Sequence, residues 1–212
     1  MLAIVLFFFK DWVVLIKSGY NQVVHKKRSV EGRMFWYIVF ATIPAGILSL
    51  ILDKISGKLI GDNLNVEMLI IVMGLILYIV DKRAKSNVKY EKITFKQSML
   101  IGLSQAIAAA FPGVSRSGIT MTVARSFNID REASAKYSFM LAAPITFAAV
   151  VFNLDKFTFG LPFLVGVIAS FVVGALIIKF LLNYLKKGSF KVFAIYRVII
   201  GLIVIGIFFT RI

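Results

Sequence analysis

The chain has 212 residues, of which 59% are hydrophobic, and it carries a formal net charge of +15 without any cysteine. The apolar share exceeds the roughly one half that is usual in soluble domains, and it is concentrated in runs that approach the length of a membrane-spanning helix. The lack of cysteine excludes disulfides and thiolate metal sites. We therefore predict an all-α, polytopic membrane helix bundle that forms a single domain over residues 1–212.

Six apolar runs are predicted to be transmembrane helices. The first begins at the second residue without the basic flank or cleavage site of a signal peptide, so it is assigned as a span. The first three runs form one group within residues 1–80, and the last three runs form a second group within residues 137–210. In chain order the runs are Leu2–Ile16, Phe35–Leu52, Val66–Val80, Tyr137–Phe152, Phe159–Leu182 and Val192–Phe209.

The positive charge lies in short loops between these runs. Residues 17–33, 81–96 and 186–191 are each rich in lysine and arginine. Short basic loops between spans mark the cytoplasmic side of a membrane. The charge therefore favours a membrane protein, with the lipid bilayer as its surroundings, over a protein that binds nucleic acid.

Residues 97–127 do not form a convincing full span, because proline and glycine interrupt their middle. If this stretch crossed the membrane once, the basic loop 186–191 would lie outside. If it enters and leaves on the cytoplasmic side, all three basic loops lie inside, as the charge rule requires. We therefore predict a re-entrant helical hairpin over residues 97–127.

The two groups of three spans then run in opposite senses, which is typical of an inverted-topology repeat. The second group is preceded by the hairpin, whereas the first begins directly with a span. We predict the remnant of such a repeat, with a matching hairpin expected before residue 1. Accidental symmetry is the alternative.

The predicted hairpin tip, residues 112–120, has the sequence Pro-Gly-Val-Ser-Arg-Ser-Gly-Ile-Thr. Unwound backbone at membrane depth is tolerated only where it is buried in protein or lines a watery cavity, and a guanidinium there needs an anionic partner. Arg116 offers a planar fork of donors that matches phosphate oxygens. Hydroxyl groups and glycines that admit a ligand surround it: Ser115, Ser117, Thr120, Gly113 and Gly118.

The leg after Gly118 adds the N–H groups of a helix N-terminus, which favour anions. The segment therefore predicts a phosphate or diphosphate site. The alternative is that Arg116 pairs with an internal carboxylate or with carbonyl groups and has only a structural role, in which it holds the hairpin in place. Arg197, near the start of the last span, is assigned either to snorkelling or to a structural ion pair.

Together with Gln105 and Ala108, the tip resembles the Pro-Gly-x-Ser-Arg-Ser-x-x-Thr signature of the undecaprenyl-diphosphate phosphatase family, also called the bacitracin-resistance protein family. Residues 43–45, 139–144 and 193–197 are also similar to that family, so the resemblance covers essentially the whole chain. It implies hydrolysis of undecaprenyl diphosphate to undecaprenyl phosphate and phosphate, which recycles the lipid carrier of peptidoglycan synthesis and confers bacitracin resistance.

The resemblance also implies roles for individual residues. A polyprenyl diphosphate lipid would be the partner of the site. The residues implied in catalysis are Arg116, Ser115, Ser117 and Thr120, and those implied in substrate binding are Pro112, Gly113, Gly118 and Gln105.

The sequence departs from the family pattern in one respect. The family has two carboxylates four residues apart, followed by a segment with serine and histidine, and these carboxylates are tied to a divalent cation, Mg²⁺ or Ca²⁺. No such pair occurs within a predicted span here, and no metal ligand is assigned. Asp11, Asp130 and Glu132 are expected to be solvated, and His25 lies in a basic loop.

We therefore expect this chain to contain the phosphate-binding residues of the site but not its acid/base residues. Whether the chain is active on its own is left open. A transporter or flippase for an anionic lipid or solute is the rival function, because broken helices within inverted repeats are typical of transporters. The nucleophile and the oligomeric state, including a homodimer, are also left open.

Overall fold

The computed structural model describes residues 2–59, 66–152 and 160–210. Within these ranges the regular structure is helical, and a parallel bridge between Val88 and Ile129 is the only strand-like contact. This confirms the predicted all-α class. In chain order the elements are α1 (Leu2–Phe7), α2 (Phe9–Val24), α3 (Val30–Leu59), α4 (Val66–Arg83), η2 (Tyr90–Lys92), α5 (Phe95–Leu103), α6 (Gln105–Ala110), α7 (Arg116–Ser126), α8 (Arg131–Val151), α9 (Leu161–Leu185) and α10 (Lys191–Thr210).

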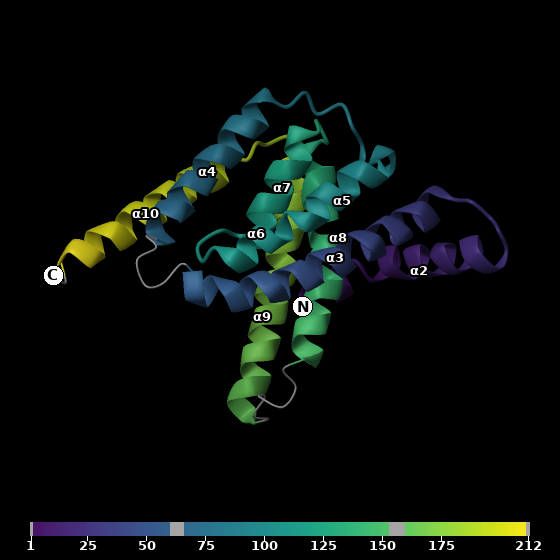
Figure 1. The fold of residues 1–212 in the computed structure, drawn as a ribbon, viewed down its shortest axis with the longest axis horizontal. Helices are drawn as coiled ribbons and strands as arrows, with labels where there is room; N and C mark the ends of the chain where they lie inside the picture. Colours follow the sequence, from purple (N-terminus) through teal and green to yellow (C-terminus); the bar gives the residue numbers. More distant parts are fainter. Residues whose placement is uncertain (1, 60–65, 153–159, 211–212) are drawn as a thin grey trace.

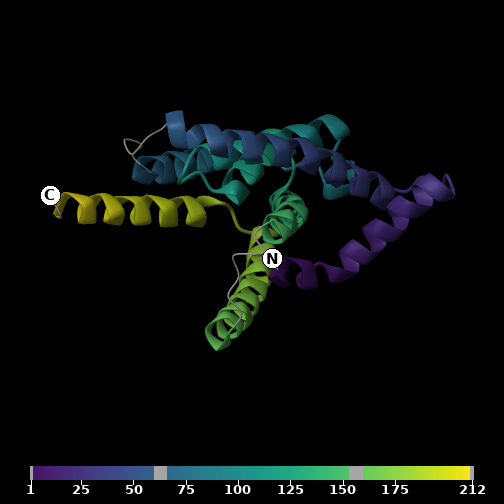
Figure 2. The same ribbon diagram turned by 60° about the horizontal axis from the view of Figure 1, so that its bottom comes forward.

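The helices pack in pairs around a central helical hairpin (Figures 1 and 2). The hairpin consists of α5 and α6 in one leg and α7 in the other. Its first leg lies against α3, and α7 lies against α4 and α8. Helices α4 and α10 pair at one end of the molecule, α2 and α3 pair at the other, and α8 projects from the middle beside α9. The predicted hairpin over residues 97–127 thus has a helical counterpart at residues 95–126.

Three helices within the described ranges are long and apolar enough to cross a membrane, namely Val30–Leu52 of α3, α8 and α9. Helix α9 exposes large apolar side chains such as Leu164, Ile168 and Phe180. Such a surface would be costly in water and is suited to lipid. The remaining predicted spans, and the sides on which the loops lie, stay predictions. Phe159, the predicted first residue of the fifth span, lies outside the described residues.

The N-terminal segment differs from the single span predicted over Leu2–Ile16. The helix is interrupted at Phe8, which has φ −97° and ψ 20°. The ring of Phe8 is buried and lies 6.3 Å, between centroids, from that of Phe139 in α8. Helix α2 then continues to Val24, so the basic connection predicted over residues 17–33 is reduced to residues 25–29. The break thus coincides with a buried residue that packs on α8, which local hydrophobicity does not reveal.

Polar side chains set the starts of the hairpin legs and of the helix that follows. Thr94 caps α5, because Thr94 Oγ1 accepts the N–H of Gln97 at 3.3 Å and Gln97 Oε1 accepts the N–H of Thr94 at 2.9 Å. Ser115 caps α7, and Asp130 caps α8 by accepting the N–H of Ala133 at 2.7 Å. Such caps satisfy N–H groups that have no acceptor within the helix, and so place the helix starts.

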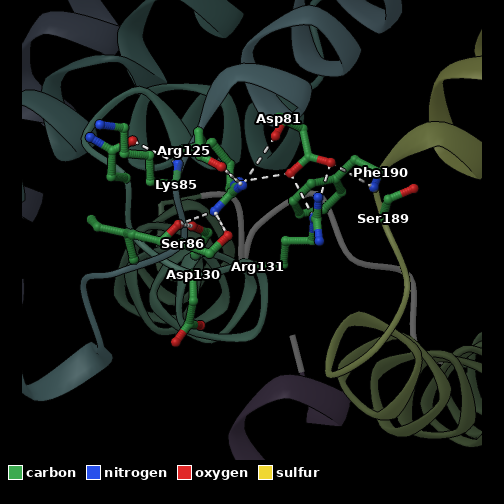
Figure 3. A network of polar contacts seen from close by, with 12 residues as sticks. Asp81, Lys85, Ser86, Arg125, Asp130, Arg131, Ser189 and Phe190 are labelled. Carbon is green, nitrogen blue, oxygen red and sulfur yellow. Dashed lines mark hydrogen bonds and ion pairs between the residues drawn. The ribbon is translucent and has the colours of Figure 1, made fainter.

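A buried carboxylate at the end of α4, that of Asp81, joins four parts of the chain (Figure 3). Its Oδ1 accepts from Arg125 Nε at 2.7 Å and from Arg131 Nε at 2.8 Å. Its Oδ2 accepts the backbone N–H of Phe190 at 3.2 Å. Asp81 is 2% exposed and Arg125 is 0% exposed. The carboxylate therefore connects α4 with the end of α7, the start of α8 and the segment that leads into α10.

The guanidinium of Arg125 uses all three of its nitrogen atoms. Besides the ion pair, its Nη1 donates to Ser86 Oγ at 2.9 Å and to the carbonyl oxygen of Ile129. Its Nη2 donates to the carbonyl oxygens of Asp81 at 3.2 Å and Ala84 at 3.3 Å. A buried charge is tolerated when it is paired and its donors are satisfied. This network anchors the C-terminal end of α7.

Gly102 allows α5 to lie directly against the backbone of α3. A Cβ atom added to Gly102 would come within 2.7 Å of both the Cβ and the carbonyl oxygen of Ala41. Because neither atom can move independently of α3, we expect Gly102→Ala to lower the free energy of unfolding by about 1–3 kcal/mol. The measurement is thermal unfolding of the detergent-purified protein.

Gly46→Ala is the matched control, because nothing lies within 4 Å of a Cβ atom at that position. Helix propensity should make this variant neutral or slightly stabilising. Equal unfolding midpoints for the two variants would contradict the close contact between α3 and α5.

Candidate functional site

The tip of the central hairpin is a tight turn between α6 and α7. Gly113 in this turn has a φ of +88°, which residues with a Cβ atom rarely adopt. A Cβ atom there would also lie 2.7 Å from the carbonyl oxygen of Val66, at the start of α4. Gly113 therefore lets the turn lie directly against α4, and this contact helps to determine where α7 begins.

The first turn of α7 carries a concentration of hydrogen-bond donors. Ser115 is the N-cap residue, and its Oγ accepts the N–H of Gly118 at 3.2 Å. The Ser115 and Ser117 hydroxyl oxygens lie 3.2 Å apart. Arg116 is the first residue of the helix. The first N–H groups of a helix lack intrahelical acceptors and mark the positive end of its dipole, so this turn is suited to an anion.

Thr120 connects this turn to α8. Its Oγ1 lies 2.7 Å from Ser138 Oγ, and both side chains are buried. The same oxygen is within hydrogen-bond distance of the carbonyl oxygens of Arg116, at 3.0 Å, and Ser117, at 3.1 Å. The pair of hydroxyl groups thus holds the first turn of α7 at a defined position beside α8.

A cavity of about 500 Å³ lies beside the first turn of α7. Its apolar lining comes from α1, α6, α8 and Val114, and none of its lining residues in the described part of the chain is acidic. Arg116 is partly buried, and among the described residues it forms no ion pair. The cavity therefore combines hydroxyl donors with a cation that has no ion-pair partner in the part of the chain that the structure describes. Its polar lining consists of Ser115, Arg116, Ser117, Thr120, Ser138 and Thr146.

Of the eight residues predicted for the site, Ser115, Arg116, Ser117 and Thr120 line the cavity, and the other four do not. Gly113 and Gly118 lie in the turn and the first turn of α7 beside it. Pro112 is exposed in the turn, and Gln105 is 1% exposed at the start of α6. Neither amide atom of the Gln105 side chain has a hydrogen-bond partner within the described ranges. The structure thus places Gln105 in the protein interior, and its role toward a substrate stays a prediction, as do the roles of Ser115, Arg116, Ser117, Thr120, Gly113, Gly118 and Pro112.

Sequence reasoning did not assign Ser138 and Thr146 of α8 to the site. Both line the cavity, and Ser138 also contacts Thr120. Ser134 and Ser138 are four residues apart, and this spacing places small polar side chains on one face of a helix. That pattern could have indicated a polar face of α8, although not which helix it contacts.

The acidic residues expected to be solvated form ion pairs with lysine side chains, and Asp11 and Glu132 remain 39% and 46% exposed. Asp11 Oδ1 lies 2.6 Å from Lys136 Nζ, Asp130 Oδ2 lies 3.0 Å from Lys89 Nζ, and Glu132 Oε1 lies 3.8 Å from Lys186 Nζ. The hydrogen bond and the charge of Asp130 raise the pKa of Lys89. These carboxylates do not line the cavity. His25 likewise lies apart from it, at the C-terminal end of α2.

The chain matches the family model described as "Bacitracin resistance protein BacA" over residues 1–203. It is 40% identical over 208 residues to a protein of Pelotomaculum thermopropionicum named undecaprenyl-diphosphatase, which covers 97% of this chain and 77% of that protein. It is also 40% identical over 214 residues to the undecaprenyl-diphosphatase of Desulforudis audaxviator, which covers 100% of this chain and 80% of that protein. The protein of the same name in Moorella thermoacetica is 34% identical, with the same coverage. On this evidence the chain belongs to the bacitracin resistance protein BacA family.

Proposed function

We propose that this chain is a membrane hydrolase that removes the terminal phosphate of undecaprenyl diphosphate and leaves undecaprenyl phosphate. The main support is Arg116, a partly buried guanidinium without an ion-pair partner among the described residues, which lines a cavity at the start of α7. The named activity of the relatives supports a diphosphate as the anion that would complete this site. The reaction would recycle the lipid carrier of peptidoglycan synthesis and so confer bacitracin resistance.

The residues of the cavity can neutralise and orient a phosphate group. Breaking a phosphoanhydride requires stabilisation of negative charge on the transferred phosphate and on the leaving group. Arg116 offers two parallel N–H donors to phosphate oxygens. The hydroxyl of Ser117 lies 3.2 Å from that of Ser115, the N-cap residue of α7, and the first N–H groups of α7, which lack acceptors within the helix, can donate to an anion. Thr120, through its contact with Ser138, keeps that end in place.

Family resemblance also implies a divalent cation, Mg²⁺ or Ca²⁺. The described residues that line the cavity do not fit such an ion, since they include neither a carboxylate nor an imidazole. No group of three potential ligands for a metal ion occurs among the described residues as a whole. A cation would therefore have to be held by other groups, and we assign no step of the reaction to it.

The proposed location is the bacterial inner membrane, with several crossings of the bilayer. Three sufficiently long apolar helices and the exposed apolar surface of α9 support this proposal. The basic connections between helices support the cytoplasmic placement of those loops. Light scattering of the detergent-solubilised chain would test the homodimer that the sequence leaves open.

The test of the proposed function is release of inorganic phosphate by the purified chain from undecaprenyl diphosphate and from its shorter farnesyl analogue. We expect release that increases with the amount of protein, and none from farnesyl monophosphate. Parallel reactions with Mg²⁺, with Ca²⁺ and with EDTA measure the need for a cation. No release under any of these conditions would contradict the proposal. Transfer of intact diphosphate lipid across a vesicle membrane would identify the rival flippase.

A further inference from the structure

A second cavity, of about 330 Å³, lies between α2, α3, η2 and α8. Among the described residues it shares no lining residue with the cavity beside α7. Its volume is within the range of small-ligand pockets, which is about 300–1,000 Å³. Part of its lining is apolar, and the polar part consists of Lys10, Asp11, Glu31, Tyr90, Glu91 and Lys136.

The second cavity lies at one end of two helices that are long enough to cross a membrane. The apolar segment of α3 begins at Val30, and Glu31 in its first turn lines the cavity. The apolar segment of α8 begins at Arg131, and Lys136 near its start lines the cavity as well. The ends of membrane-crossing helices lie at the level of the lipid headgroups. The cavity is therefore at headgroup depth.

The charges of this cavity differ from those of the chain as a whole. The chain has 25 lysine and arginine residues and 10 acidic residues. Three of those ten, Asp11, Glu31 and Glu91, line the cavity together with two lysines. A purely anionic headgroup would be repelled by the carboxylates. A headgroup that carries an ammonium group as well as a phosphate can use charges of both signs.

One cation of the cavity has a defined position. Lys136 Nζ lies 2.6 Å from Asp11 Oδ1, and it lies 5.2 Å from the centre of the Tyr90 ring. The ion pair joins α8 to α2, and the ring belongs to η2. Because a lysine ammonium has three N–H donors, Lys136 can donate to a phosphate oxygen in addition to Asp11.

Two further carboxylates of the cavity come from other elements. Glu31 lies in the first turn of α3, and Glu91 lies in η2. Arg33 Nη2 donates to the carbonyl oxygen of Glu91 at 2.8 Å, which connects η2 to α3. Both glutamates are exposed, whereas Leu15 and Met34 of the same lining are buried. The two carboxylates thus lie on the open side of the cavity.

Apolar surface continues from the cavity along α2. Val14 lines the cavity and is 49% exposed. The neighbouring Val13 and Ile16 are exposed large apolar residues as well. Exposed apolar surface of this kind is suited to lipid chains. The site therefore offers charged groups for a headgroup beside apolar side chains for the chains of the same lipid.

We propose that the second cavity binds the headgroup of a zwitterionic phospholipid with a primary amine, of the phosphatidylethanolamine type. Lys10 and Lys136 bind its phosphate, and Glu31 and Glu91 accept hydrogen bonds from its ammonium group. A primary ammonium group has three N–H donors, whereas the trimethylated ammonium group of phosphatidylcholine has none. The inference concerns a lipid bound beside the bundle, and it does not rest on the proposed hydrolysis.

The experiment compares three dihexanoyl phospholipids as ligands of the detergent-purified full chain: phosphatidylethanolamine, phosphatidylcholine and phosphatidylglycerol. Titration calorimetry measures their dissociation constants. We expect the ethanolamine lipid to bind the wild-type chain about tenfold or more tightly than the choline lipid, as for a gain of charged hydrogen bonds. The double variant Glu31→Gln, Glu91→Gln should lose this preference. Lys10→Gln should weaken both lipids equally, because both contain the phosphate.

Glu132→Gln is the matched control, because Glu132 is also a solvent-accessible carboxylate and is not among the lining residues. It should keep the wild-type preference. All variants change exposed or half-exposed side chains, so their unfolding midpoints without lipid should equal that of the wild type.

Three results would overturn the inference. The first is equal affinity of the wild-type chain for the ethanolamine and choline lipids. The second is tighter binding of phosphatidylglycerol, which would indicate an anion site. The third is a double variant that keeps the wild-type preference, since the two carboxylates would then not bind the ammonium group. Phosphate release from farnesyl diphosphate is measured separately, so either proposal can fail without the other.

Discussion

Replacing Arg116 with alanine is expected to reduce phosphate release from farnesyl diphosphate by about 100-fold or more. This is the scale of loss when a single preorganised donor to a developing charge is removed. Arg116 lines the cavity, and no described acidic residue neutralises it, so its loss removes the strongest attraction for a phosphate group. The measurement is initial rate per mole of purified protein, with the amount of folded protein checked by gel filtration.

Two further variants make this result specific. Arg28→Ala removes an exposed arginine from the connection between α2 and α3 and should retain full activity. Arg116→Lys retains the charge but not the planar fork, so it should recover only a small part of the rate. If Arg116→Ala and Arg28→Ala released phosphate at the same rate, Arg116 would have no part in the reaction.

Asp81→Asn is expected to lower the free energy of unfolding by about 3–5 kcal/mol, the usual cost of removing one partner from a buried ion pair. The substitution keeps the shape of the side chain but leaves Arg125, which is 0% exposed, without a counter-charge. Arg131 loses the same partner. Denaturant-induced unfolding of the detergent-solubilised protein measures the change.

Glu132→Gln is the matched control for Asp81→Asn, since it also converts an acid to its amide. Glu132 lies 3.8 Å from Lys186, and both side chains are about half exposed. Exposed pairs of this kind contribute about 0–1 kcal/mol, so this variant should unfold nearly as the wild type does. Similar losses for the two variants would show that the Asp81 network does not anchor α4, α7 and α8.

The double variant with Arg125→Met adds a second check. Because it removes the unpaired cation together with the carboxylate, it should recover part of the stability lost in Asp81→Asn. Additive losses would mean that Asp81 and Arg125 are not coupled.

The helical hairpin and the turn at its tip could be predicted because the sequence signals for both are local. Gly113 and Pro112 interrupt an apolar stretch, and Ser115 is a residue type that begins helices. The break at Phe8 was missed, and its ring packs near Phe139 of a helix that is distant in the sequence, a contact that the apolar run does not reveal. The apolar runs show where helices occur but not where one of them bends.

The partners of charged side chains could not be predicted in the same way. Asp81 and Arg125 are 44 positions apart, and each alone resembles an ordinary charge near the end of a helix. Arg197 was assigned to snorkelling or to an ion pair, since its sequence neighbours do not show that Gly74 and Gly118 surround it. Gln105 was predicted to bind substrate. Its side-chain amide is buried and has no hydrogen-bond partner among the described residues. Its position in the sequence does not reveal which groups surround that amide, so its role stays a prediction.

The order of residues was sufficient to predict an all-α membrane protein and a helix that begins within the Ser-Arg-Ser segment, because hydrophobic runs, caps and turns act over a few neighbouring residues. Packing between helices decided that Arg116 lines a cavity without an acidic partner among its lining residues, that Asp81 holds two arginines, and that Arg197 reaches the first turn of α7. The free energy of a charge depends on which groups surround it in space, and only the packed helices bring those groups together.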